Sequence, residues 1–206
     1  MHRALCICHL VSPRATRTRL LLVVHKDEAR KPTNTGMLAA RCLSNSAVAV
    51  IGDRARPLEA ALLAEAEEAV LLFPLDGALP LAPRPPSAGP VTLVVPDGSW
   101  RQARKVRTRV PGLAALPCVT LPEGAPTTYR LRTERRDGGL ATLEAIARAL
   151  AILEGDDVAA HAMLAVFTVM VERTLWLRGA LRDDQVTGGI PDAARAHDPR
   201  GGLPTR

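Results

Sequence analysis

The sequence predicts an α/β fold, a single domain with a mostly parallel sheet flanked by helices. Short apolar runs alternate along the chain with segments of helical periodicity, which is the pattern of such sheets. The chain has 206 residues, a length that suits one domain. Of these residues 47% are hydrophobic but only 2% are aromatic, so we expect a core built mainly from alanine, valine and leucine.

Five apolar runs are predicted to be strands. Each is short and rich in residues that favour strands. The run before Pro96 is expected to be the central strand, and Pro96 is expected to end its hydrogen-bonded ladder because proline lacks an N–H. The predicted strands are Thr18–His25, Ala47–Ile51, Ala69–Phe73, Val91–Val95 and Val119–Leu121.

Helices are predicted between and after these strands. Asn34 or Thr35 can cap the first helix, and Pro57 suits the first turn of the second. The apolar stretch Val158–Val171 contains polar residues and is shorter than the roughly 20 residues of a membrane span, so it is interpreted as a buried helix. The predicted helices are Thr35–Cys42, Pro57–Ala66, Leu140–Leu153 and Asp157–Leu177, with a further one after Ser99.

The chain is predicted to have three parts: an N-terminal segment at 1–16, the α/β domain at 17–180 and a disordered tail at 181–206. The tail is rich in Asp, Gly, Pro and Arg and lacks apolar periodicity. The proline-rich stretch Asp76–Pro90 is interpreted as a surface connection, since the next strand follows at once. No segment has the pattern of a targeting signal, so we expect a cytoplasmic location and no membrane attachment.

A compact polar turn follows the central strand at Asp97-Gly98-Ser99-Trp100. Asp97 is expected at the carboxyl end of the strand, which is where open α/β sheets bind ligands. Gly98 permits a tight turn into the next helix. The simpler alternative is that Asp97 or Ser99 only caps this helix. Trp100 either stacks on a base or on adenine, or packs the turn against the core.

Positive charge is concentrated directly after this turn. Lys and Arg outnumber Asp and Glu by 27 to 21, giving a net charge of +6, and such a balance favours a polyanionic partner, with nucleic acid the leading candidate. If the segment is helical, one face carries Arg101, Arg104, Lys105 and Thr108, and another carries Trp100, Ala103, Val106 and Val110. A merely solvated surface is the alternative. The cations expected to contact RNA phosphates are Arg101, Arg104, Lys105, Arg107 and Arg109, with Arg130 and Arg132 as an extension.

The order of residues in Asp97–Lys105, DGSWRQARK, resembles the signature of the DTW-domain family, the tRNA-uridine aminocarboxypropyltransferases. Ser99 stands where that family usually has threonine. Three more short blocks match in the family's order, at Lys31–Gly36, Tyr129–Arg132 and Leu140–Ala145. The resemblance covers roughly residues 5–180.

This resemblance implies transfer of the 3-amino-3-carboxypropyl group of S-adenosylmethionine to N3 of a uridine in tRNA, and a SPOUT-like trefoil knot in the C-terminal half. Asp97 is implied as base or orienting acceptor, and Trp100 as a catalytic neighbour. The partner expected is tRNA, and no protein partner is evident. The residues expected to contact the cofactor are Asn34, Thr35, Gly36, Gly98, Ser99, Leu121, Glu123, Gly124, Thr142 and Glu144.

Cys6 and Cys8 form a Cys-x-Cys pair near the N-terminus. Members of the family typically carry a Cys-x-x-Cys pair upstream, which suggests a four-thiolate zinc site, but this chain lacks that pair. His2 or His9 could supply a nitrogen ligand, although structural zinc takes four ligands. Zinc or a reduced cysteine pair are the two alternatives. Two other functions stay open: a SPOUT-like RNA methyltransferase and a non-catalytic RNA-binding protein.

Overall fold

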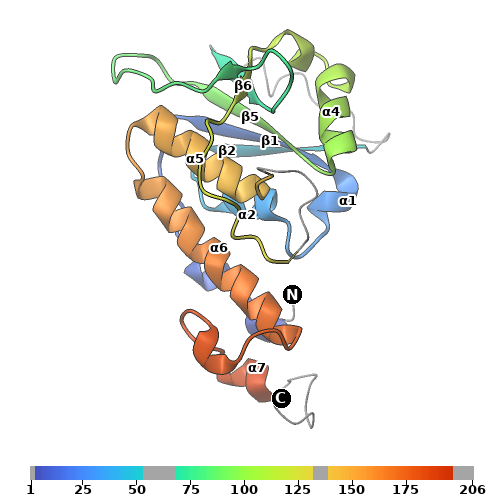
Figure 1. Cartoon of the computed structure of the whole chain (residues 1–206), viewed down its shortest axis with the longest axis vertical. Coiled ribbons are helices and arrows are strands. Elements are labelled where there is room, and N and C mark those ends of the chain that lie inside the picture. The colour runs from blue at the N-terminus through green and yellow to red at the C-terminus, as the bar shows by residue number, and fades with distance from the viewer. Residues whose placement is uncertain (1–2, 53–67, 132–138, 197–206) are drawn as a thin grey trace.

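The computed structural model describes residues 3–52, 68–131 and 139–196, and its centre is one six-stranded sheet. The strand order is β2-β1-β5-β3-β6-β4, and every pairing is parallel, which confirms the predicted α/β class (Figure 1). The predicted trefoil knot stays a prediction. The strands are β1 Arg19–His25, β2 Ser46–Ile51, β3 Ala69–Leu72, β4 Leu79–Pro80, β5 Thr92–Asp97 and β6 Cys118–Thr120.

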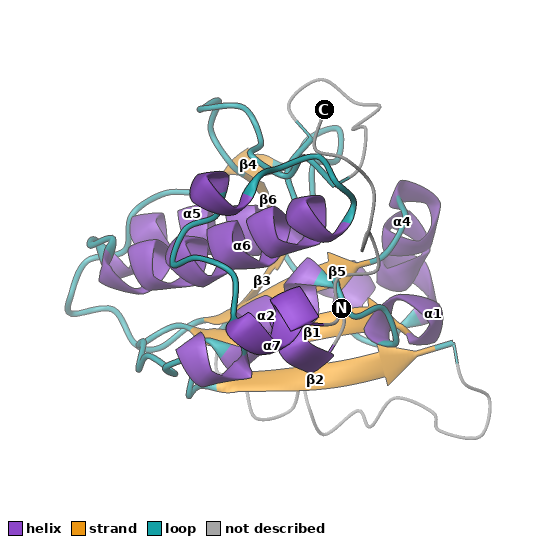
Figure 2. Ribbon diagram, turned by 90° about the horizontal axis from the view of Figure 1, so that it is seen from below, coloured by secondary structure: helices purple, strands orange, loops and turns teal. Residues whose placement is uncertain are grey.

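Helices cover both faces of this sheet. In Figure 2, α2, α5 and α6 form one group and α4 stands apart from it. The α-helices are α1 Lys26–Ala29, α2 Thr35–Arg41, α4 Trp100–Arg109, α5 Thr142–Glu154, α6 Val158–Leu177 and α7 Asp192–Ala196. Short 3₁₀ helices are η1 Arg3–Leu5, η2 Cys8–Leu10, η3 Leu113–Ala115 and η4 Asp183–Gln185.

Alternation along the central strands divides the core in two. Leu20, Leu22 and Val24 of β1 join one cluster with buried residues of α2, α5 and α6. Leu21 and Val23 join a second cluster with the buried residues of α4. Because successive side chains of a strand point to opposite faces, one apolar strand serves both layers. The sheet is therefore buried on both sides in its middle.

Strand β5 runs two residues beyond its predicted end, so the expectation that Pro96 ends the ladder was wrong. Pro96 pairs with Val23 and Asp97 with Val24 of β1. On the other side, pairing with β3 reaches only Val94. Pro96 thus lies where β5 has a single neighbour, a position that tolerates a residue without an N–H.

Two further segments differ from the sequence prediction. The proline-rich stretch is not only a connection, because Leu79–Pro80 forms the edge strand β4 against β6. The expected disordered tail was wrong for residues 183–196, which contain η4 and α7. Val186, Ile190 and Ala194 are buried there in a third cluster with Leu5 and Trp176, so apolar burial orders this segment. The predicted helix Pro57–Ala66 lies outside the described residues.

Helix α6 has the length and hydropathy of a membrane-spanning helix, a property that core helices of globular domains share. Within this helix, 56% of the 18-residue stretch with that hydropathy is buried inside the structure. Met163, Phe167 and Met170 lie in the first core cluster. This packing agrees with the predicted buried helix.

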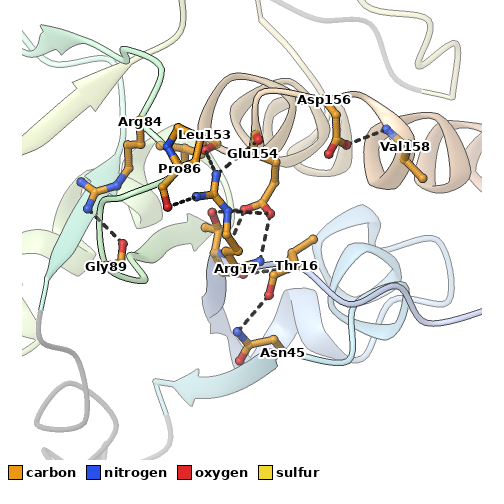
Figure 3. Close-up of polar contacts among 11 residues, drawn as sticks. Thr16, Arg17, Asn45, Arg84, Pro86, Gly89, Leu153, Glu154, Asp156 and Val158 are labelled. Carbon is orange, nitrogen blue, oxygen red and sulfur yellow. Dashed lines mark hydrogen bonds and ion pairs between the residues drawn. The ribbon is translucent and has the colours of Figure 1, made fainter.

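The C-terminal end of α5 is tied to the start of β1 by Glu154 (Figure 3). Its Oε1 accepts hydrogen bonds from the Thr18 N–H at 2.9 Å and from the Thr18 hydroxyl at 2.5 Å. Its Oε2 accepts one from the Arg17 N–H at 2.9 Å. Burial opposes ionisation of Glu154, but these hydrogen bonds outweigh it and lower the pKa of the carboxyl. Glu154 therefore fixes α5 against the sheet.

Candidate active site

The candidate site lies at the ends of β1 and β5, two neighbouring parallel strands after which the chain continues to opposite sides of the sheet. The chain passes from β1 through α2 to β2 on one side, and from β5 through α4 to β6 on the other. Ligands of open α/β sheets bind at the carboxyl ends of such a strand pair. Asp97 is the last residue of β5, and Asn34 directly precedes α2 after β1. Both therefore lie at this edge.

Asp97 is a buried carboxylate held by two uncharged donors. Its relative exposure is 6%. Oδ2 accepts a hydrogen bond from Asn34 Nδ2 at 2.6 Å, and Oδ1 accepts one from Thr142 Oγ1 at 2.5 Å. It forms no ion pair within the described part of the chain. The carboxylate is thus oriented, while no cation among these residues neutralises its charge.

The block around Asn34 is shaped to receive this carboxylate. Asn34 caps α2, because its Oδ1 accepts a hydrogen bond from the Met37 N–H at 2.6 Å, and this bond directs Nδ2 toward Asp97. A Cβ on Gly36 would lie 2.9 Å from Asp97 Cγ and 3.0 Å from Leu22 Cδ1. Glycine is therefore the residue that fits at this position. Thr35, which lies between Asn34 and Gly36 in the sequence, is also buried.

Helix α4 is capped by Ser99, which forms a reciprocal capping box with Gln102. Ser99 Oγ accepts a hydrogen bond from the Gln102 N–H at 3.4 Å, and Gln102 Oε1 accepts one from the Ser99 N–H at 2.8 Å. Asp97 is not the cap. Gly98 is half-buried, and a Cβ there would lie 3.1 Å from Gln102 Cβ. Trp100 is 37% exposed and its ring centre lies 5.8 Å from that of Phe73, so it both packs and faces solvent.

Glu144, expected near the cofactor, is fully engaged by its own chain. It is 3% exposed. Its oxygens accept hydrogen bonds from the Thr127 hydroxyl, from the N–H and hydroxyl of Thr128, and from the Ala141 N–H, over distances of 2.5 to 2.9 Å. Glu144 thus anchors the loop before Tyr129 to the start of α5. The Tyr129 hydroxyl in turn lies 3.4 Å from the carbonyl oxygen of Thr33 and donates to it.

The four sequence blocks therefore converge on one edge of the sheet. The family model described as DTW domain matches residues 1–175. The chain belongs to the DTW-domain family. It is also 29% identical over 147 residues to tRNA-uridine aminocarboxypropyltransferase 2 of Drosophila melanogaster. The matched part is 69% of this chain and 59% of that protein, so the chain spans less than two thirds of the relative's length. No solved structure matches the chain.

The loop after β6 lies against α5 of the DTW domain. Leu121 is half-buried against the first core cluster, whereas Glu123 and Gly124 are exposed. Arg148 of α5 donates to the carbonyl oxygen of Ala125. This loop, which is expected to contact the cofactor, is thus tied to the helix that also carries Thr142. Its contact with a cofactor stays a prediction.

Helix α4 has the two faces that its sequence predicted. Ala103, Val106 and Val110 are buried. Arg107 differs from the other cations, because it is half-buried and its Nη2 donates to the carbonyl oxygen of Ala114 at 3.2 Å. Arg132 lies outside the described residues. The exposed cations are Arg101, Arg104, Lys105 and Arg109 on α4, and Arg130 near the Tyr129 block.

Cys6 and Cys8 are both exposed, and the Cys8 N–H donates to Cys6 Sγ at 3.4 Å. No group of three or more His, Cys, Asp or Glu side chains among the described residues is placed to hold a metal ion. His9 is exposed, and His2 lies outside the described residues. Two thiols do not fit structural zinc, which takes four ligands.

Sequence reasoning missed Thr127 and Thr128, which hold Glu144. Their adjacency to the Tyr129 block was the available signal. Nothing in the sequence links them to Glu144, because the contact joins residues 16 or 17 positions apart across a loop.

Proposed function

We propose that this protein transfers the 3-amino-3-carboxypropyl group of S-adenosylmethionine to N3 of a uridine in tRNA and releases methylthioadenosine. The observation that carries the proposal is the environment of Asp97. A buried carboxylate, oriented by Asn34 and Thr142 and free of a cationic partner among the described residues, lies at the ligand-binding edge of the sheet. The name of the Drosophila relative supports the same reaction.

The uridine imide must lose its proton before N3 can attack. N3 then forms a bond to the methylene carbon next to the sulfonium, the bond from that carbon to sulfur breaks, and sulfur keeps the electron pair. S-adenosylmethionine supplies the activated carbon as a substrate. We assign Asp97 the role of accepting the N3 proton or its hydrogen bond. Asn34 and Thr142 are positioning residues, since they hold Asp97 through one oxygen each.

The charge at the site suits this donor. The sulfonium and the amino group of S-adenosylmethionine are positive and its carboxylate is negative, so the molecule carries net positive charge. A carboxylate at this edge of the sheet is compatible in sign with such a cationic ligand. We assign the exposed part of Trp100 to stacking on a base, a contact worth roughly 1–3 kcal/mol in nucleic-acid binders. The cationic face of α4 supports tRNA as the polyanionic substrate.

The test is Asp97→Asn. The amide oxygen can still accept from Asn34, and the amide nitrogen can donate to the Thr142 hydroxyl, so the site keeps its shape. We expect turnover to fall by roughly 100-fold or more, as general-base loss commonly costs, while the affinity for S-adenosylmethionine changes only a few-fold. Mass spectrometry of the released nucleoside and of the digested tRNA measures both products.

Thermal unfolding of Asp97→Asn provides the control for a structural effect. Near wild-type formation of methylthioadenosine and modified uridine by this variant would show that Asp97 is not the base. Release of S-adenosylhomocysteine by the wild type would instead identify an RNA methyltransferase. Binding of tRNA and S-adenosylmethionine without any product would identify a non-catalytic RNA-binding protein.

A further inference from the structure

A cavity of about 360 Å³ borders the candidate active site on the side of α2. Its wall is formed by the N-terminal segment, by the loop before α2, by α2 itself and by Met170 of α6. Asn34 belongs to this wall. The side chain that donates to Asp97 therefore also borders the cavity.

Four cationic side chains line the cavity, Arg3, Arg30, Lys31 and Arg41, and no acidic residue does. Lys31 is compensated by an ion pair with Glu28 at 2.6 Å. Over the ranges 3–52, 68–131 and 139–196, the side chains of the three arginines have neither an ion pair nor a hydrogen bond. A hollow lined by one sign of charge concentrates counter-ions. The cavity is thus built for an anion.

The sign of the charge separates the two substrates of the proposed reaction. S-adenosylmethionine is net positive, so three uncompensated arginines oppose its binding. Each phosphodiester of RNA carries a negative charge that guanidinium groups bind through paired hydrogen bonds. We propose that this cavity binds the phosphodiester backbone of the tRNA next to the uridine that is modified. This inference rests on the proposed function.

The arrangement gives the RNA two cationic contacts, one on each side of Asp97. The cavity lies on the face of the sheet that α2 covers, and the exposed cations of α4 lie on the opposite face (Figure 1). Asp97 ends the central strand between these two faces. A strand of RNA that crosses this edge places phosphates on both surfaces and the target nucleotide at the carboxylate.

The test compares Arg30→Ala/Arg41→Ala with a control that loses the same charge elsewhere, Arg14→Ala/Arg182→Ala. Arg14 and Arg182 are exposed and do not line the cavity. For the cavity variant, the plot of log affinity for tRNA against log salt concentration should become shallower by roughly one unit per lost phosphate contact. Its affinity for S-adenosylmethionine should stay within about twofold. The control should keep the wild-type slope.

Equal slopes in the two double variants would overturn the proposal, as would a loss of S-adenosylmethionine affinity that matches the loss of tRNA affinity. If the alanine variant unfolds, Arg30→Gln/Arg41→Gln keeps the side-chain volume and gives the same comparison. These readouts are equilibrium affinities. A wild-type protein that binds tRNA in this way but forms no modified uridine would refute the proposed function and leave the cavity assignment standing.

A second test needs no substitution, because Cys6 also lines the cavity. Cys6 is exposed, whereas Cys42 is buried and Cys118 is half-buried. Iodoacetamide should therefore alkylate Cys6 before the latter two. We expect saturating tRNA to slow alkylation of Cys6 at least fivefold relative to free protein, as roughly follows from site occupancy. Protection by S-adenosylmethionine alone, without protection by tRNA, would overturn the proposal.

Discussion

Asp97 depends on neighbours that carry no charge. Asn34 and Thr142 each donate one hydrogen bond to it, and Gly36 leaves the space that its carboxyl group occupies. None of the three neutralises the carboxylate. The site therefore orients Asp97 through uncharged donors and without a cationic partner among the described residues.

Gly36→Ala should displace this carboxylate. The new Cβ would lie 2.9 Å from Asp97 Cγ, closer than real contacts allow, and 3.0 Å from Leu22. We expect turnover to fall about tenfold or more, because a shift of the order of 1 Å at a reacting group is costly, and stability to fall by about 1–3 kcal/mol. Steady-state kinetics and urea unfolding measure the two effects.

Gly89→Ala is the matched control for Gly36→Ala, because a Cβ at Gly89 meets nothing within 4 Å. It should leave both turnover and stability unchanged. Wild-type turnover in Gly36→Ala would show that the position of Asp97 tolerates movement.

The sequence located the members of this site but not their contacts. Asn34 and Asp97 were each identified from local pattern as well as from a family block, and Thr142 through a family block alone. The hydrogen bonds that join them span 63 and 45 residues, and no periodicity reports such contacts. The four donors that Glu144 accepts from its own chain were not predicted for the same reason, and its contact with a cofactor stays a prediction.

At the scale of elements, the sequence predicted the strands and helices that a local pattern of apolar residues determines. The five predicted strands were confirmed with ends shifted by no more than two residues. The two-residue strand β4 was missed, because its pairing with β6 leaves no repeating pattern. Helix α7 was missed because a short helix owes its stability to packing, here against Leu5 and Trp176.

Glu154→Gln tests the clamp between α5 and β1. Since the folded pKa of Glu154 is lowered, the carboxylate stabilises the fold fully above about pH 4.3, the unfolded value, and loses this contribution as pH falls through the folded pKa. We expect Glu154→Gln to be less stable by about 1–3 kcal/mol at pH 7. The difference from wild type should shrink on acidification, measured by urea unfolding at several pH values.

Glu123→Gln provides the comparison for this clamp, because Glu123 is exposed and makes no hydrogen bond in the described structure. Glu123→Gln should be as stable as the wild type at pH 7. A constant difference between Glu154→Gln and wild type at every pH would assign the effect of Glu154 to packing and not to charge.

The exposed cations of α4 are expected to contribute to the salt dependence of tRNA binding. Replacing Arg104 and Lys105 by Ala should flatten the salt dependence of tRNA binding by about one unit per lost phosphate contact. Arg107→Ala is the internal control, because Arg107 is turned toward Ala114 and should leave the slope unchanged. Filter binding across a salt series measures both. An unchanged slope in the double variant would remove this face from the RNA interface.

At the scale of the whole molecule, the third core cluster is small and separate from the two that hold the sheet. Leu5, Trp176, Val186, Ile190 and Ala194 form it. Elements with few apolar contacts open locally before the rest of a fold. The segment that contains η4 and α7 is therefore expected to be the least stable part of the described structure.

Ile190→Ala should reveal that the segment containing η4 and α7 is less stable than the sheet. Loss of a buried isoleucine side chain costs about 2–5 kcal/mol, and few other buried side chains hold this segment. We expect limited proteolysis to cut between α6 and α7 faster than in wild type, with the sheet left intact, as mass spectrometry of the fragments will report. Equal cleavage of the sheet and of this segment would show that the molecule opens as one cooperative unit.

The three-way contact at Asp97 has a consequence for synthesis of the chain. Asn34 and Asp97 leave the ribosome well before Thr142, which supplies the second hydrogen bond, and Glu154 closes α5 onto Thr18 across 136 residues. Loop closure over such separations gives a high contact order and slow folding. A nascent chain that ends before α5 contains Asn34 but not Thr142, so only one of the two hydrogen bonds to Asp97 can form. The arrangement around Asp97 is therefore complete only late in synthesis, when Thr142 of α5 has been made.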